Sequence, residues 1–207
     1  MKAKQSATPR LKAPQQGEVQ STLRPEPSPT GLRRTAIHEA GHAVLYLALG
    51  LGCKGATIAP DCNRGSAGAA RHGGKWGAPA PRLGERDNDI ATLRMLAEES
   101  FFLRHAIGCY AGAEAVRRWG ARHWLSGAEN DYREACYHMN DITDDEKSVD
   151  LLFELAQRRC EILVRNYWPE IKAVAERLLR SRTLDAETVR RIWCKSLLSR
   201  EGCMMTW

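Results

Sequence analysis

Apolar residues recur at steps of three and four positions in the stretch between Gly31 and Gly50. They are Leu32, Ile37, Ala40, Val44, Leu45, Ala48 and Leu49. On a helix this spacing places them along one face, and a glycine such as Gly50 or Gly52 is typical of a helix end. The pattern therefore predicts a helix that begins near Gly31, ends at Gly50 or Gly52 and buries one face.

The chain that follows this helix has the pattern of short extended segments. Residues 53–60 (CKGATIAP) predict a strand that stops at Pro60, and residues 65–72 (GSAGAARH) predict a second strand of small residues. Residues 72–84 are rich in glycine and proline, which predicts a loop. We therefore expect a small β-sheet next to the first helix.

Helical spacing returns at Asn88 and continues through Trp119. Beyond it, Ser126 and Glu129 fit a capping box, in which a hydroxyl and a carboxylate satisfy the free N–H groups of a helix start. This capping box predicts that a helix opens there and covers residues 130–141.

The last part of the chain also has helical spacing. Residues 149–179 predict two packed helices with a break before Pro169, because proline cannot continue a helix from the preceding turn. Residues 183–193 predict a short closing helix. Taken together, the patterns predict a fold that is mainly α with a small β-sheet, an α+β fold without internal repeats.

Composition separates a tail from the domain. Residues 1–30 contain five of the nine prolines and much Gln, Ser and Thr, so we expect a disordered, basic, proline-rich tail. Residues 1–34 carry a net charge of +5 out of the chain's formal +6, which leaves the rest close to neutral. Because such tails are commonly solvated linkers, nucleic acid is not an expected partner. We expect one domain at 31–198 and a C-terminal tail at 199–207.

Apolar runs and cysteines bear on where the protein works. No run approaches the roughly 18 apolar residues of a membrane-spanning helix, and the first residues lack the apolar region of a signal peptide. We therefore expect no membrane span and a cytoplasmic location. The seven cysteines are widely spaced without a CxxC pair, so we interpret them as reduced, small hydrophobic residues.

The predicted first helix carries an HExxH pattern at residues 38–42 (HEAGH). Side chains four positions apart lie on one helix face, so His38 and His42 can reach one metal ion. Glu39 lies about a quarter-turn away and is in reach of a water on that ion. Two histidine ligands and a carboxylate that takes a proton from water are the arrangement of zinc peptidases. The alternative is a helix surface that happens to carry two histidines.

A catalytic zinc ion normally has three protein ligands and keeps one position for water. The candidates for the third ligand are Asp131, Glu114, His123 and His138. Asp131 lies just behind a predicted helix N-terminus, where the helix dipole favours an ionised carboxylate. Sequence spacing does not exclude the other three candidates.

Several motifs in this order resemble the peptidase domain of FtsH-type ATP-dependent zinc proteases, over roughly residues 31–193. They are TAIHEAGHAV, GATIAP, IGCYAGAEAV, SGAENDYREA and LLRSRTLDAETVRRI. The resemblance implies that His38, His42 and Asp131 bind zinc and that Glu39 is the general base. It also implies that Glu114 lies near the site, and that a strand at residues 67–71 holds an extended substrate by strand addition.

The expected function is therefore that of a zinc-dependent endopeptidase acting on unfolded or extended protein substrates. The family's ATPase module would precede residue 31, where we expect only the tail, so the expected enzyme has no ATPase of its own. A separate AAA+ unfoldase and a homo-oligomer are the partners that the resemblance suggests.

Three other functions compete with this prediction. One is a nucleic-acid binder that uses the basic tail, which predicts salt-sensitive binding that is lost on deletion of residues 1–30. The other two are zinc proteins. A repressor-cleaving zinc protease of the ImmA type also uses HExxH, but it predicts a different third ligand. A catalytically silent zinc-binding interaction module predicts a closed site, for instance with His123 or His138 in the position otherwise left for water.

Overall fold

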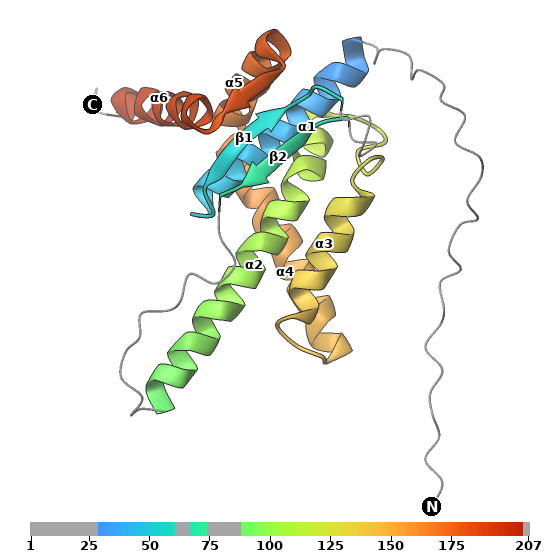
Figure 1. The fold of residues 1–207 in the computed structure, drawn as a ribbon, viewed down its shortest axis with the longest axis vertical. Helices are drawn as coiled ribbons and strands as arrows, with labels where there is room; N and C mark the ends of the chain where they lie inside the picture. The colour runs from blue at the N-terminus through green and yellow to red at the C-terminus, as the bar shows by residue number, and fades with distance from the viewer. Residues whose placement is uncertain (1–28, 61–66, 74–87, 205–207) are drawn as a thin grey trace, which may run out of the picture.

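The computed structural model describes residues 29–60, 67–73 and 88–204. It is mainly helical with a small antiparallel sheet, which confirms the predicted α+β class (Figure 1). Most of the predicted tail at 1–30 and of the predicted loop at 72–84 lies outside the described residues. The elements are α1 (Pro29–Ala48), β1 (Cys53–Thr57), β2 (Ala69–His72), α2 (Asn88–Trp119), α3 (Glu129–Asn140), α4 (Glu146–Asn166), α5 (Trp168–Ser181), β3 (Thr183–Asp185) and α6 (Ala186–Met204).

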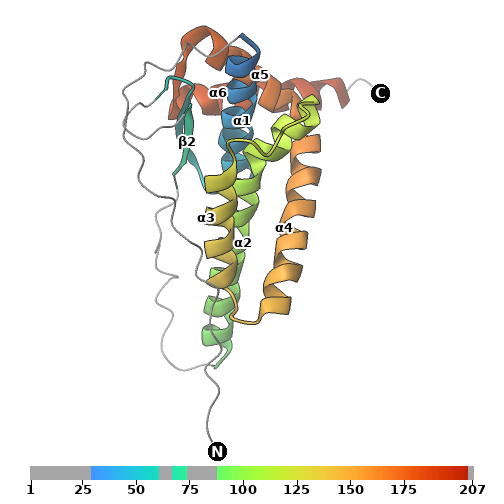
Figure 2. The ribbon, with the colours of Figure 1, turned by 90° about the vertical axis from the view of Figure 1, so that its right-hand side faces the viewer.

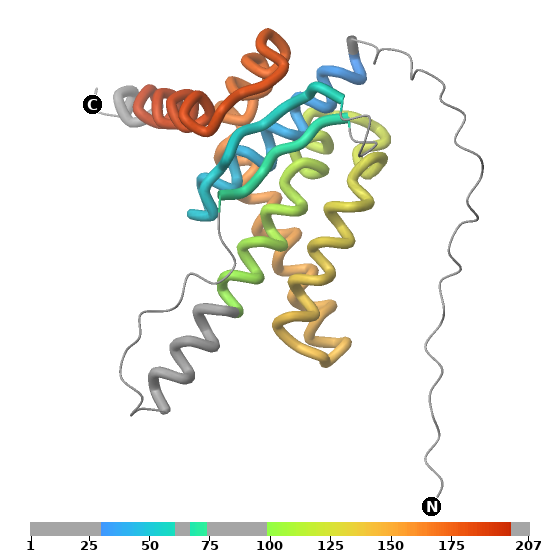
Figure 3. Tube along the Cα trace, viewed as in Figure 1, coloured from blue at the N-terminus to red at the C-terminus, as the bar shows by residue number. Residues whose placement is uncertain are grey.

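The helix α1 is the centre of the fold. It packs against α2, α5 and the sheet, and α3 and α4 lie along α2 (Figures 1 and 2). Figure 3 traces the C-terminal pair α5 and α6 together at one end of the molecule. The buried face of α1 consists mainly of small residues, namely Ala36, Ala40, Ala43 and Val44, each 0% exposed. These small residues let neighbouring elements approach α1 closely.

The contact between α1 and α2 is especially close. A Cβ atom on Gly41 would lie 2.6 Å from the carbonyl oxygen of Ala111 and 2.8 Å from the Cβ atom of Ala115. A Cβ atom on Gly108 would lie 2.7 Å from the ring of Tyr46. Since the interior is packed to crystal-like density, a larger residue at Gly41 would push the two helices apart, and one at Gly108 would displace the ring of Tyr46. The crossing holds the histidine face of α1 directly against α2.

The sheet has the strand order β2-β1-β3, and both pairings are antiparallel. Ala56 of β1 is paired with Ala70 on one side and Leu184 on the other. Both predicted strands are confirmed, but β3 was not predicted, because its three residues were assigned to the closing helix. Leu184 is buried, and its pairing partner lies far away in the sequence, so local spacing could not identify this strand.

Two predicted helix ends are wrong. The N-cap of α3 is Ala128 and no side chain caps it, so Ser126 and Glu129 do not form the predicted capping box. Glu129 instead accepts a hydrogen bond of 3.2 Å from the N–H of Gly127, because the helix begins at Glu129 itself. At the other end of the chain, α6 continues to Met204, beyond Trp193, where the closing helix was predicted to end.

The break in the C-terminal helices follows the prediction. The helix α4 ends at Asn166 and α5 starts at Trp168, with Pro169 in its first turn, where a missing N–H costs nothing.

Cys53, Cys109 and Cys160 are buried free thiols, as expected. Within the described ranges, no helix combines the length and the apolar character needed to cross a membrane.

Candidate metal centre

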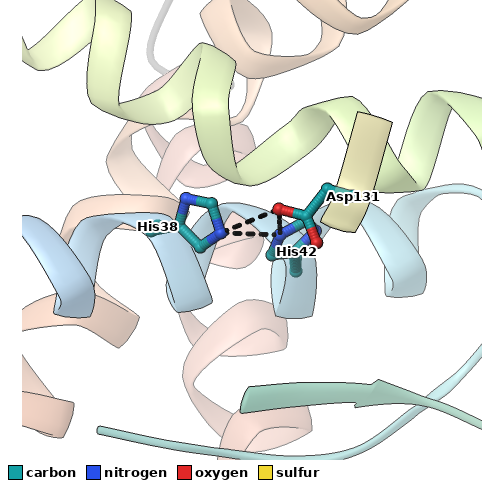
Figure 4. A group of neighbouring side chains, drawn as sticks. All are labelled: His38, His42 and Asp131. Carbon is teal, nitrogen blue, oxygen red and sulfur yellow. Dashed lines mark hydrogen bonds and ion pairs between the residues drawn. The ribbon is translucent and has the colours of Figure 1, made fainter. Parts of the chain in front are cut away.

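His38, His42 and Asp131 meet at the junction of α1 and α3 (Figure 4). The Nε2 atoms of His38 and His42 are 3.1 Å apart. Oδ2 of Asp131 lies 3.1 Å from Nε2 of His38 and 3.3 Å from Nε2 of His42. The three atoms thus form a nearly equilateral triangle, with two corners from one helix turn and the third from the first turn of α3.

This triangle fits the donor set of a metal ion. Ligands at about 2.0–2.1 Å from a tetrahedral zinc ion are roughly 3.4 Å from one another, close to the separations found here. Oδ2 of Asp131 is buried without a hydrogen-bond partner, although it faces two imidazole nitrogens. A buried carboxylate oxygen aimed at two other potential ligands is best satisfied by a cation between them.

The orientation of His42 is fixed from behind by α2. Nδ1 of His42 lies 2.8 Å from the carbonyl oxygen of Gly108. The carbonyl can only accept, so Nδ1 carries the proton and Nε2 is turned towards the centre of the triangle. A ring nitrogen that donates to a backbone carbonyl is the usual support of a metal-binding histidine.

Gly112 of α2 makes room for both imidazole rings. A Cβ atom at this position would lie 2.5 Å from Nε2 of His42 and 2.6 Å from Cε1 of His38. The sequence analysis did not identify Gly112 as a site residue. The sequence does show that Gly112 lies among small residues in the segment IGCYAGAEAV, which suggests close packing. A glycine by itself, however, does not show which side chains pack against it.

The charges of the three residues are coupled. Burial disfavours the charged form of His42, but the Asp131 carboxylate, helped by Glu39 and the Gly108 carbonyl, raises the pKa of His42 to about 9. Burial likewise opposes ionisation of Asp131, yet the two histidines hold the pKa of Asp131 well below its ordinary value. Without an ion, His42 is therefore protonated and Asp131 ionised at pH 7, and a metal ion binds at this cluster by displacing the proton of His42.

Glu39 lies between this cluster and the sheet. It is 6% exposed, and its carboxylate accepts a hydrogen bond from the N–H of Ala70 in β2. Burial raises the pKa of Glu39, while the neighbouring His38 and His42 oppose the rise. A Cβ atom on Gly68 would lie 2.9 Å from Cγ and from Oε1 of Glu39, so this glycine leaves the space that the carboxylate occupies.

The other candidates for the third ligand lie elsewhere. Both carboxylate oxygens of Glu114 accept hydrogen bonds of 2.7 Å from Arg117, at the edge of a cavity of about 470 Å³. The carbonyl of His123 accepts a hydrogen bond from Arg34, and the ring of His138 packs on His105. Across the described residues, the candidate metal group contains Asp131 and none of these three.

The fold and the site together define a mainly helical protein with a candidate metal centre of two histidines and one aspartate. No protein-family model matches the chain, and a search of curated proteins found no match either.

Proposed function

We propose that the protein is a zinc-dependent endopeptidase of the FtsH-type fold that hydrolyses peptide bonds in unfolded or extended protein substrates. The observation that carries this proposal is the convergence of His38, His42 and Asp131 on one point, with the buried carboxylate of Glu39 beside it. Three ligands leave a tetrahedral ion one position, as catalytic zinc sites require.

Each residue has a separate role in this proposal. His38, His42 and Asp131 hold the ion, and the Gly108 carbonyl keeps the His42 ring in its binding orientation. When bound, zinc supplies Lewis acidity towards a peptide carbonyl and towards water. Glu39 accepts a proton from the attacking water and returns it to the leaving amine.

The substrate binds along β2 in this proposal. Among the described strands, β2 pairs with β1 alone, so β2 lies at the edge of the sheet. The N–H of Ala70 reaches Glu39, so one backbone group of the strand contacts the proposed general base. An extended peptide added beside β2 by main-chain hydrogen bonds would therefore pass close to the metal ligands. Strand addition needs little side-chain specificity, which suits unfolded substrates.

Metal content and cleavage test the proposal together. Zinc is measured by plasma mass spectrometry on wild type, Asp131→Ala and Glu39→Gln, and the same samples are assayed with fluorescent unfolded casein. We expect chelator-sensitive cleavage by wild type, loss of zinc from this centre in Asp131→Ala, and retained zinc without cleavage in Glu39→Gln. Glu176→Gln, at an exposed position on α5, is the matched control and retains both.

Other results would point to the competing functions. Zinc bound at this centre without cleavage of casein, with or without an added AAA+ unfoldase, would favour a silent zinc-binding module. Zinc that stays bound at this centre in Asp131→Ala would mean that another residue is the third ligand, as an ImmA-type protease predicts. Gel filtration of wild type tests the homo-oligomer that the resemblance suggests.

A further inference from the structure

Arg34 ties the helix α1 to the segment that leads into α3. Its Nη2 atom donates a hydrogen bond of 2.7 Å to the carbonyl oxygen of His123 and another to the carbonyl oxygen of Ser126. The N–H of Ser126 donates a hydrogen bond of 3.2 Å to the same carbonyl of His123, so residues 123–126 form a hydrogen-bonded turn. A charged donor that bonds two backbone carbonyls of one turn holds that turn at a fixed place beside α1.

The turn at residues 123–126 lies shortly before the residue that completes the metal centre. Gly127, with a φ of 87°, and Ala128, the N-cap of α3, follow the turn, and Asp131 lies in the first turn of the helix. The N–H of Tyr132 donates a hydrogen bond of 3.0 Å to the carbonyl oxygen of Ala128. A displacement of the 123–126 turn is therefore passed along a short, hydrogen-bonded segment to Asp131.

Arg34 also shares a helix face with the two histidine ligands. Positions 34, 38 and 42 of α1 are four residues apart, and this spacing places their side chains along one face. Oδ2 of Asp131 reaches the same face, where it meets His38 and His42. The 123–126 turn and Asp131 therefore approach one side of α1, about one helix turn apart.

The packing of α3 leaves a need for such a tie. This helix packs mainly along α2 and also against α4. Packing along α2 sets the direction of α3, but metal–ligand distances tolerate only about 0.2 Å, so the start of α3 must also be fixed relative to α1. Backbone N–H groups of Glu129 and Gly127 lower the pKa of Glu129, the first residue of α3, and the charge of Arg34 adds to this lowering. Arg34 thus acts on the helix start as well as on the turn before it.

We infer that Arg34 is a positioning residue of the candidate metal centre, which holds the 123–126 turn beside α1 so that Asp131 reaches both histidine rings. The inference rests on the proposed function, since it takes Zn²⁺ as the ion that these three residues bind. Arg34 is not itself a ligand, because a guanidinium group has no lone pair to offer. Removing a positive charge by itself favours the binding of a cation, so a loss of Zn²⁺ affinity has the sign of lost positioning.

Zinc affinity, measured by competitive titration against a chromophoric chelator, tests this role in the full chain. Arg34→Ala should weaken Zn²⁺ binding by about 10-fold to 100-fold, the range found when the support of a metal ligand is removed. Arg33→Ala is the matched control and should keep the wild-type affinity, because it removes the same charge from the neighbouring, exposed position. Ala121 and Trp124 pack against the core, so Arg34→Ala should displace the turn without unfolding the domain.

A double-mutant cycle separates positioning from a general loss of structure. If Arg34 acts through Asp131, then adding Arg34→Ala to Asp131→Ala should change the residual Zn²⁺ affinity of the two histidines by less than about 2-fold. A merely structural role of Arg34 would instead give losses of affinity that add.

Amide hydrogen exchange in the metal-free protein measures the position of the turn directly. The N–H groups of Ser126 and Ala128 should exchange faster in Arg34→Ala than in wild type, and at the wild-type rate in Arg33→Ala. Wild-type Zn²⁺ affinity in Arg34→Ala, additive losses in the cycle, or unchanged exchange at these two amides would overturn the inference and leave the proposed function standing. Absence of Zn²⁺ binding by wild type would overturn the proposed function and this inference together.

Discussion

Substituting Gly112 by alanine should disrupt the candidate metal centre without unfolding the protein. The new Cβ atom would lie 2.5 Å from Nε2 of His42 and 2.7 Å from Nδ1 of His38. Since non-bonded atoms prefer at least about 3.5 Å, one or both rings must retreat by about 1 Å. Metal–ligand distances tolerate only about 0.2 Å, so this displacement should weaken zinc binding by at least about 10-fold to 100-fold.

The effect on folding should be small by comparison. Overpacking costs roughly 1–3 kcal/mol, and the better helix propensity of alanine offsets about 1 kcal/mol of that, so we expect a net loss of up to about 2 kcal/mol. Gly120→Ala, just beyond the end of α2, is the matched control: its φ of 95° strains an alanine at a cost of about 1 kcal/mol, but a Cβ atom there would meet nothing within 4 Å.

The assay combines competitive zinc titration against a chromophoric chelator with urea unfolding of the metal-free protein. Gly112→Ala and Gly120→Ala should unfold at similar urea concentrations, while only Gly112→Ala loses zinc affinity at the candidate metal centre. Wild-type zinc affinity in Gly112→Ala would refute the reasoning, because it would mean that the two histidines do not form the site with the geometry described here.

Three further predictions test other parts of the structure. Gly68→Ala would place a Cβ atom 2.9 Å from Oε1 of Glu39, so casein cleavage should fall at least about 10-fold while zinc content stays unchanged. Leu178 is 0% exposed, so Leu178→Ala should cost about 2–5 kcal/mol in urea unfolding and leave zinc content intact. Burial, with the neighbouring His72, His138 and Arg104, lowers the pKa of His105 from 6.5 to about 4. The unfolded state therefore binds the extra proton first, and metal-free protein should lose up to about 3 kcal/mol of stability as the pH falls from 6.5 to 4. His105→Phe should flatten this part of the stability profile, and an unchanged profile would show that His105 is not the group responsible.

Local spacing was sufficient for features that depend on neighbours in the sequence. It predicted α1, both strands of the first hairpin, the bounds of α2 and the break before Pro169. It also predicted that His38 and His42 share a helix face, because that follows from helix geometry alone. Local spacing failed at the start of α3. Ser126 and Glu129 fit a capping box in the sequence, but the helix begins at Glu129 with Ala128 as its N-cap. Short capping patterns are compatible with more than one starting residue.

By itself, then, the sequence determined the helical class, the small sheet and the pair of histidines at the candidate metal centre. Only the tertiary structure shows which of Asp131, Glu114, His123 and His138 lies beside the two rings, since all four are compatible with the spacing and the packing of α3 along α2 brings Asp131 to both rings. It alone also revealed β3 and the space left by Gly112. Each of these rests on contacts between residues distant along the chain, and periodicity within a single element carries no information about such contacts.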